Sequence, residues 1–381
     1  MININTQASA GTADPASAGP ETEPQASRRL AWRVILWVVL AVVYLLAPFV
    51  LSAFWLQLLL LSGASAVAAL GLRFLIGVSG QLSLAHAFFV GVGAYAYAKL
   101  GPSVPGGGTG SVGLPSAVAA LGAIVFAGLA GLIFSPVAAR LRGIYLGLAS
   151  LSLVVIGTAL LTNVSSLGGV YGIRASALTF GSFSFWDDDP ATAVLGTPFG
   201  TMQRLWFLVM LVLLGVFVVM RRLERSRTGR ALKSVRDAPA LAASVGVHVQ
   251  SYRSLAFVVS SLAAGIAGVL LALVYQNIVP DDFGLELSVL YLAMVVLGGT
   301  RSAVGAMLGA LAVTGLPLVL TQYASDLPFV AQPGQVGGLD PGTVSQYVFG
   351  LLLIAVLLAR FGRLPVLLSR VRPARRVAAR G

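Results

Sequence analysis

The chain has 381 residues and a formal net charge of +12, and 57% of its residues are hydrophobic whereas 10% are charged. Because soluble domains carry about a quarter charged residues, this composition excludes an ordinary soluble protein, which would expose large apolar patches. Cysteine is absent and the only histidines are His86 and His248, which excludes disulfides and leaves too few ligands for a metal cluster.

The two ends of the chain differ from its middle. Residues 1–27 are rich in Ala, Ser, Pro, Thr and Gly and are predicted to form a disordered N-terminal tail. They do not resemble a signal peptide, because a long polar stretch rather than a short basic one precedes the first apolar run. Residues 366–381 are predicted to form a basic tail, which leaves 28–365 as a transmembrane domain.

Long charge-free runs occur throughout this domain. A helix needs about 20 mostly apolar residues to cross the hydrocarbon of a bilayer. The sequence therefore predicts an all-α, polytopic membrane protein with about ten transmembrane helices. The predicted crossings are 34–51, 54–72, 82–98, 116–137, 143–162, 204–220, 254–275, 287–299, 303–322 and 344–359.

The predicted crossing at 287–299 is short enough to be a re-entrant segment. A re-entrant segment would invert the helices after it and put the Arg-rich C-terminal tail outside, against the charge rule for membrane proteins. We therefore expect a short helix that ends at Gly298 and Gly299, where irregular backbone can be hydrated in a cavity.

The basic residues predict the orientation. If the N-terminus is cytoplasmic, ten crossings place all but three of the 25 lysines and arginines inside, as cytoplasmic loops require. Both termini and the loop 221–253 are then cytoplasmic, while 163–203 and 323–343 face outward. Because the charges fall between apolar runs, no nucleic-acid partner is expected. The three exceptions are Lys99, Arg174 and Arg204.

Small residues in the crossings predict close helix packing. A spacing of four residues between glycines lets helix backbones approach each other. A Gly/Ser-rich segment also precedes a helix in each half of the chain, at 77–93 and at 298–309, as in transporters with repeated halves and interrupted helices. The glycine pairs are Gly143 with Gly147, and Gly305 with Gly309.

A polar cluster of Gln81, Ser83 and His86 lies beside the first Gly-rich segment. Polar groups in an apolar stretch need partners or water, so we predict that these side chains approach the translocation pathway. Ser83 and His86 are three residues apart and would share a helix face. The alternative is that the three residues only bond neighbouring helices.

Ionisable side chains are almost absent from the predicted crossings, with His86 the single candidate. Ion-coupled transporters usually place charged residues at mid-membrane, so the sequence favours a motor located on another subunit. The chain contains no P-loop to hold ATP, no catalytic triad and no carboxylate pair, so we do not expect an enzyme. An ion-coupled secondary transporter or a passive channel is the alternative.

The loop 221–253 changes character along its length. Its first part is basic and is typical of a segment that binds anionic lipid headgroups. Further on, Pro239 can start a short helix and Gly246 can end it. A helix over 239–246 with few charges has little reason to stay in water.

We therefore predict that this short helix is a docking element for another subunit. Ala242 and Ala243 are small enough to pack against a partner, and Arg230 and Arg236 could pair with acidic groups on it. A lipid-facing amphipathic loop is the alternative interpretation.

Several short runs, taken together, match one known family. They are GQLSLAHAFF at 80–89, GVGAY at 91–95, RGIY at 142–145, GGVYGI at 168–173, GRALKSVRD at 229–237 and VVLGG at 295–299. In this order they resemble the permeases of branched-chain amino-acid ABC transporters, and in particular the M-type subunit of the leucine-isoleucine-valine importers. The resemblance covers roughly residues 70–315.

The resemblance implies a permease in the bacterial plasma (inner) membrane. The implied partners are a second homologous permease, two cytoplasmic ATP-binding subunits, a soluble substrate-binding protein and membrane lipids. ATP and Mg²⁺ would bind the ATP-binding subunits, so no cofactor is expected in this chain. The implied coupling residues are Arg230, Arg236, Asp237, Ala242, Ala243 and Gly246.

The sequence departs from the family pattern at two positions. Ala85 stands where Gly is expected, and Leu167 where Thr often precedes the glycine pair. The second departure leaves the substrate open between branched-chain or related amino acids and urea or short amides.

Overall fold

The computed structural model describes residues 44–104, 111–141, 143–181, 183–186, 193–194 and 197–323, and short stretches between 343 and 355. The chain divides into two units, Met1–Val50 and Leu51–Gly381. Residues 44–50 of the first unit are helical, and the description below concerns the second. Most of the predicted crossing 34–51, half of the crossing 344–359, most of 323–343 and both predicted tails lie outside the described residues.

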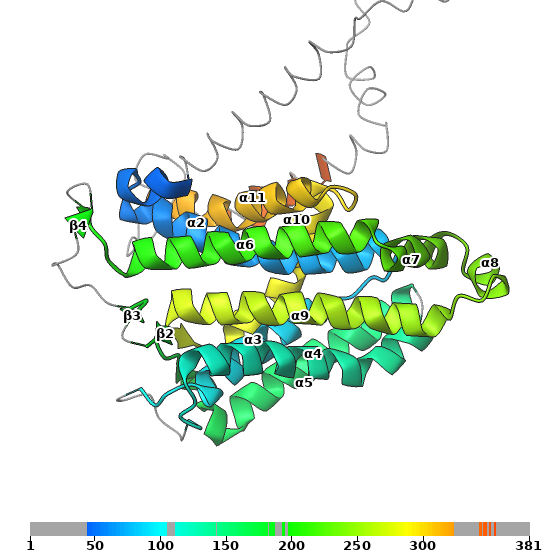
Figure 1. Ribbon diagram of the computed structural model, residues 1–381, viewed down its shortest axis with the longest axis horizontal. Coiled ribbons are helices and arrows are strands. Elements are labelled where there is room, and N and C mark those ends of the chain that lie inside the picture. The colour runs from blue at the N-terminus through cyan, green and yellow to red at the C-terminus, as the bar shows by residue number, and fades with distance from the viewer. Residues whose placement is uncertain are drawn as a thin grey trace, which may run out of the picture. The chain divides into compact units, whose positions relative to one another are not determined.

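The described part of the second unit is mostly helical (Figure 1). Every crossing predicted between residues 54 and 322 corresponds to a helix. The helices are α2 (Ala53–Arg73), α3 (His86–Leu100), α4 (Ser116–Arg140), α5 (Ile144–Asn163), α6 (Thr201–Arg225), α7 (Arg227–Asp237), α8 (Pro239–Ser244), α9 (Val249–Tyr275), α10 (Leu285–Gly298) and α11 (Ala303–Gln322). A π-helical turn, η1 (Phe74–Val78), continues α2.

Six of the described helices are long and apolar enough to cross a membrane, namely α2 with η1, α4, α5, α6, α9 and α11. Helices α3 and α10 have 15 and 14 residues. At 1.5 Å per residue they are about 21–23 Å long, less than the hydrocarbon thickness of about 30 Å. The prediction of a short helix that ends at Gly298 is confirmed.

Helices α2 and α9 form the centre of the unit. Helix α9 packs against α2, α3 and α4, and α2 also packs against α6 and α11. Residues 60–73 of α2 are all buried, and many of them are Ala, Ser or Gly, which lets neighbouring backbones approach. The surrounding helices expose large apolar side chains, as lipid-facing helices do. Examples are Leu121, Ile133, Leu211 and Leu308.

The connections at the two ends of these helices differ. Between α5 and α6 the chain forms the short helices η2 (Ser165–Leu167) and η3 (Gly169–Tyr171) and two-residue strands. At the same end lies η4 (Pro280–Phe283), before α10. The strand pairs are β1 (Ile173–Arg174) with β6 (Asn277–Ile278), β2 (Thr179–Phe180) with β3 (Phe183–Ser184), and β4 (Ala193–Val194) with β5 (Thr197–Pro198).

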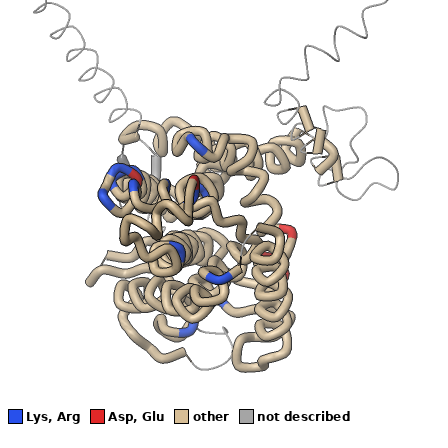
Figure 2. The backbone as a smooth tube through the Cα atoms, turned by 90° about the vertical axis from the view of Figure 1, so that its right-hand side faces the viewer, with Lys and Arg blue, Asp and Glu red and all other residues tan. Residues whose placement is uncertain are grey.

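The opposite end carries α7 and α8 (Figure 1), and Figure 2, which faces that end, shows positions of described lysines and arginines there. Helices α2, α4 and α6 finish there, and each has an arginine in its last turn. By the positive-inside rule we expect this end to be the cytoplasmic one. The predicted loop 221–253 is largely helical, because α6 extends to Arg225, α7 follows, and α9 begins at Val249.

Cysteine labelling tests this orientation, because the native chain has no cysteine. Ser234 on α7 and Ser165 in η2 are both exposed and lie in regions expected on opposite sides of the membrane. We expect an impermeant maleimide added outside cells to label Ser165→Cys and to spare Ser234→Cys until the membrane is permeabilised. External labelling of Ser234→Cys would show that the assigned orientation is inverted.

Candidate functional site

The predicted polar cluster of Gln81, Ser83 and His86 is buried, in and just after the segment that connects η1 to α3. Gln81 Nε2 donates to the carbonyl oxygen of Arg253 at 3.0 Å and also to Ser79 Oγ. Ser83 Oγ accepts a hydrogen bond from the backbone N–H of Ala85 at 3.2 Å. These bonds stabilise the non-helical backbone of this break and connect it to the first turns of α9.

The prediction that Ser83 and His86 share a helix face is wrong. Helix α3 begins only at His86, and the residues from Gly80 to Ala85 are not helical. The physical reason is Gly80, whose φ of +71° lies in the left-handed region and ends the helical path that starts in α2.

His86 joins α3 to two other helices. Its Nε2 donates to the carbonyl oxygen of Ala68 in α2 at 2.8 Å, because a carbonyl oxygen can only accept. Its ring lies edge-on to the ring of Tyr291 in α10, with the centroids 5.5 Å apart. Each of these contacts lies within the subunit, and a pathway role for Gln81, Ser83 and His86 stays a prediction.

Replacing His86 tests that role. His86→Ala removes the hydrogen bond to Ala68 and the ring contact with Tyr291, and we expect it to impair uptake more than assembly. The matched variant His86→Gln keeps a side-chain donor and should retain more transport. Uptake is measured in cells whose membranes contain equal amounts of each permease variant. Normal uptake by well-expressed His86→Ala would argue against a pathway role.

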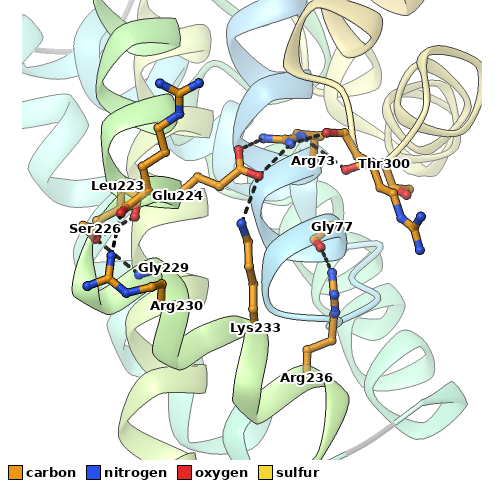
Figure 3. Close-up of polar contacts among 12 residues, drawn as sticks. Arg73, Gly77, Leu223, Glu224, Ser226, Gly229, Arg230, Lys233, Arg236 and Thr300 are labelled. Carbon is orange, nitrogen blue, oxygen red and sulfur yellow. Dashed lines mark hydrogen bonds and ion pairs between the residues drawn. The ribbon is translucent and has the colours of Figure 1, made fainter. Parts of the chain in front are cut away.

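A second polar network lies at the cytoplasmic end and centres on Arg73, the last residue of α2 (Figure 3). The Arg73 side chain is 3% exposed and forms a two-pronged ion pair with Glu224 of α6, with N–O distances of 2.8 and 3.2 Å. It also donates to the carbonyl oxygens of Thr300 and Arg301 at 3.2 and 2.7 Å. One buried cation thus connects α2, α6 and the turn between α10 and α11.

Arg236 of α7 contacts the first break directly (Figure 3). Its Nη1 donates to the carbonyl oxygen of Gly77 in η1, and its methylene groups cover Gly80, where a Cβ would come within 2.5 Å of Arg236 Cγ. A Cβ at Gly77 would overlap the carbonyl oxygen of Thr300. The non-helical segment that follows η1 and the turn at 299–302 between α10 and α11 are the two Gly-rich breaks in the helices. They are in contact near Gly77 and Thr300, and Arg236 of α7 contacts the first of them.

We call this network the cytoplasmic junction and define it by Arg73, Gly77, Gly80, Glu224, Lys233, Arg236 and Thr300. Helix α7 is attached to it through the side chains of Lys233 and Arg236. Leu232 and Val235 are fully buried, Lys233 Nζ lies 3.5 Å from Glu224 Oε1, and the side chain of Ser226 caps the first turn of α7 by accepting from the N–H of Gly229.

The predicted docking helix exists as α8 and is shorter than 239–246. Gly246, with φ of +85°, follows its end. Ala242 is 3% exposed and packs inside the chain, so its assignment to the docking surface is wrong. Ala243 is exposed, and beside it Leu241 and Val245 are 67% and 72% exposed. We call Leu241, Ala243 and Val245 the α8 apolar surface.

The predicted coupling arginines already have partners in the chain. Besides contacting Gly77, Arg236 pairs with Asp237 at 2.8 Å, and its hydrogen bond lowers the pKa of the Asp237 carboxyl below the ordinary value. Arg230 Nη1 donates to the carbonyl oxygen of Arg225 at 3.0 Å. The prediction that Arg236 pairs with acidic groups on an ATPase is therefore wrong, because its side chain bonds to Gly77 in η1 of the same chain.

The predicted packing glycines fall into two groups. Gly305 and Gly309 of α11 face the backbone of α10, where a Cβ would overlap the carbonyl oxygens of Gly298 and Met294. Among the described residues, a Cβ at Gly143 would meet no atom within 4 Å, and one at Gly147 would reach only Leu82. The prediction that Gly143 and Gly147 let two helices of this chain pack closely is therefore wrong. Gly143 instead adopts a φ of +56°, which favours glycine, just before α5 begins.

Breaking the junction should destabilise the fold. Glu224→Ala would leave Arg73 buried without its carboxylate, and we expect a loss of about 2–3 kcal/mol, below the 3–5 kcal/mol of a fully buried pair because the Glu224 side chain is 21% exposed. Thermal unfolding in detergent measures the effect. Asp237→Ala, which removes an exposed ion pair, is the control and should change little. Equal melting temperatures for the two variants would contradict the assignment.

Comparisons with known proteins agree with the resemblance found in the sequence. Residues 54–357 match the family described as branched-chain amino acid transport system / permease component. The chain is 30% identical over 259 residues to the high-affinity branched-chain amino acid transport system permease protein LivM of Escherichia coli K12, covering 64% of this chain and 58% of that protein.

A second type of permease also matches. The chain is 27% identical over 253 residues to the protein LivH of Salmonella typhimurium, covering 66% of this chain and 80% of LivH. A probable LivM of Methanocaldococcus jannaschii is 25% identical over 238 residues, with 60% and 61% covered. The chain thus spans less than two thirds of the length of these LivM proteins. No solved structure matches significantly.

Proposed function

Since the chain belongs to the family of permease components of branched-chain amino acid transport systems, we propose that it is the membrane-spanning permease subunit of an ATP-driven importer. Its cargo is a branched-chain or related amino acid delivered by a soluble binding protein. The observation that carries the proposal is the α8 apolar surface, an exposed patch of Leu241, Ala243 and Val245 on an otherwise charged cytoplasmic segment.

The partners follow from the same premise. LivM and LivH are both permeases, and this chain is similar to each, which supports pairing with a second homologous permease. Two cytoplasmic ATP-binding subunits would hold ATP and Mg²⁺ and hydrolyse the nucleotide, so the chain itself acts as a transport subunit and not as an enzyme. The α8 apolar surface is the contact we assign to one of them.

The cytoplasmic junction supplies a route from α8 to the membrane. A force on α8 passes to α7, which packs against it, and from Arg236 to Gly77 and Gly80. Arg73 links the same region to the turn at Thr300. Movement of the docking helix would therefore act on both Gly-rich breaks together, and Gln81 would transmit it to the start of α9.

Reconstitution of the assembled complex tests the proposal. We expect ATP hydrolysis and uptake to rise when leucine, isoleucine or valine is added with the binding protein. Stimulation by urea or a short amide in place of these amino acids would reassign the substrate. Uptake by the permease alone that follows an ion gradient and needs no ATP-binding subunit would support an ion-coupled transporter and refute the importer.

A further inference from the structure

A cavity of about 310 Å³ opens at the cytoplasmic end beside the junction. Five basic side chains line it and one carboxylate accompanies them. Ser302 and Ala303, at the start of α11, complete its wall. The charged residues are Arg73, Arg221, Arg225, Lys233, Arg301 and Glu224.

The charges in this cavity do not balance. Glu224 is engaged by Arg73 and Lys233, which leaves Arg221, Arg225 and Arg301 exposed around the same space. None of these three forms an ion pair with a described carboxylate. Like charges around one cavity repel each other, so an anion in the cavity would relieve that repulsion and stabilise the site.

The start of α11 adds to the same field. A helix N-terminus carries about half a positive charge and favours anions. Ser302 and Ala303, the cap and the first residue of this 20-residue helix, line the cavity, so the first turn of α11 lies at its wall. The positive potential from the helix N-terminus is weaker than that of the arginines and adds to it.

The position of the cavity indicates which anion it takes. Helices α2 and α6 end beside it and α11 begins there, and lipid headgroups are expected at the ends of membrane-spanning helices. Exposed apolar side chains lie close in sequence to the lining residues, at Val218 and Val219 before Arg221 on α6 and at Val304 and Leu308 after Ala303 on α11. The α8 apolar surface lies farther out, beyond α7 (Figure 1).

We propose that this cavity binds the phosphate headgroup of an anionic phospholipid from the cytoplasmic leaflet. Basic pockets between transmembrane helices on the cytoplasmic side suit such headgroups, and the apolar flanks of α6 and α11 would accompany the acyl chains. A bound phosphate would also contact Arg73 and Lys233 and so brace the cytoplasmic junction. The inference rests on the membrane orientation and is independent of the transported substrate.

Lipid association measures this directly. Spin-labelled phosphatidylglycerol and phosphatidylcholine are compared on the full-length permease in phosphatidylcholine nanodiscs. We expect wild type to prefer phosphatidylglycerol, and the preference to fall on the order of fivefold for each arginine replaced in R221Q/R225Q and in R301Q. The double variant R222Q/R227Q is the control, because it removes two positive charges from exposed neighbouring positions outside the cavity. It should keep most of the preference for phosphatidylglycerol.

Three results would overturn the proposal. One is an absence of phosphatidylglycerol preference in the wild type. A second is equal loss in R221Q/R225Q and R222Q/R227Q, which would indicate diffuse attraction to the membrane. A third is full displacement of the lipid by millimolar inorganic phosphate or by the ATP-binding subunits, which would assign the cavity to a free anion or to acidic protein side chains. Folding of each variant is checked by its elution profile in detergent.

Discussion

Gly305→Ala should prevent α10 and α11 from packing and should remove most of the folded permease. A Cβ at Gly305 would overlap the carbonyl oxygen of Gly298, and a Cβ at Gly298 would overlap that of Gly305. Backbone atoms cannot turn aside as a side chain can, so the cost should exceed the about 1–3 kcal/mol typical of overpacked cores. The junction would fail too, because Arg73 bonds to Thr300 and Arg301 in the turn between these helices.

Gly215→Ala is the matched control. Gly215 lies within α6, and a Cβ there would meet no atom within 4 Å among the described residues. Because Ala favours helix by about 1 kcal/mol over Gly, this variant should be as stable as wild type or more so. Size-exclusion profiles and melting temperatures of the two purified variants decide the matter, and equal melting would contradict the close contact of α10 with α11.

Ala243→Glu should abolish transport while leaving the permease inserted and folded. Ala243 is exposed on α8 between Leu241 and Val245, so a carboxylate there costs nothing within the subunit. In a docked complex it would bury an unpaired charge against the ATP-binding subunit, which costs several kcal/mol. We therefore expect association of that subunit to weaken by at least a hundredfold, with uptake falling in parallel.

Ser234→Glu is the control for this variant. It adds the same charge to the same cytoplasmic segment, on an exposed face of α7, and should bind the ATP-binding subunit as wild type does. Leu241→Ser removes apolar contact without adding charge and should give an intermediate loss. Co-purification and substrate-stimulated ATP hydrolysis are the readouts. Wild-type binding and uptake by Ala243→Glu would mean that α8 does not dock the motor.

The transmembrane helices could be predicted from sequence because the bilayer demands long apolar runs. Hydropathy found α4, α5, α9 and α11 to within a few residues. It placed the start of α3 too early, because an apolar run does not reveal that Gly80 adopts a positive φ. Helix α7 was missed as a helix, although the serine cap at Ser226 and the spacing of Leu232 and Val235 were available signals.

The junction could not be predicted in the same way. Arg73 and Glu224 are 151 residues apart, and Arg73 and Thr300 are 227 apart, so no local pattern connects them. The sequence marked Arg73 only as a cytoplasmic charge, and it assigned Arg236 to a partner protein. Both side chains turn inward instead, Arg73 to the carbonyl oxygens of Thr300 and Arg301 and Arg236 to that of Gly77.

The π-helical turn at the end of α2 has a geometric consequence. In η1 the N–H of Ser79 bonds to the carbonyl oxygen of Phe74, five residues back instead of four. One extra residue is thus accommodated in a single turn. If that turn reverted to α-helical bonding, the backbone after it would rotate by about 100°, the angle between successive residues of an α-helix. Arg236 contacts this turn at Gly77, so a movement of α7 that changed the bonding of the turn would rotate the backbone at Gln81.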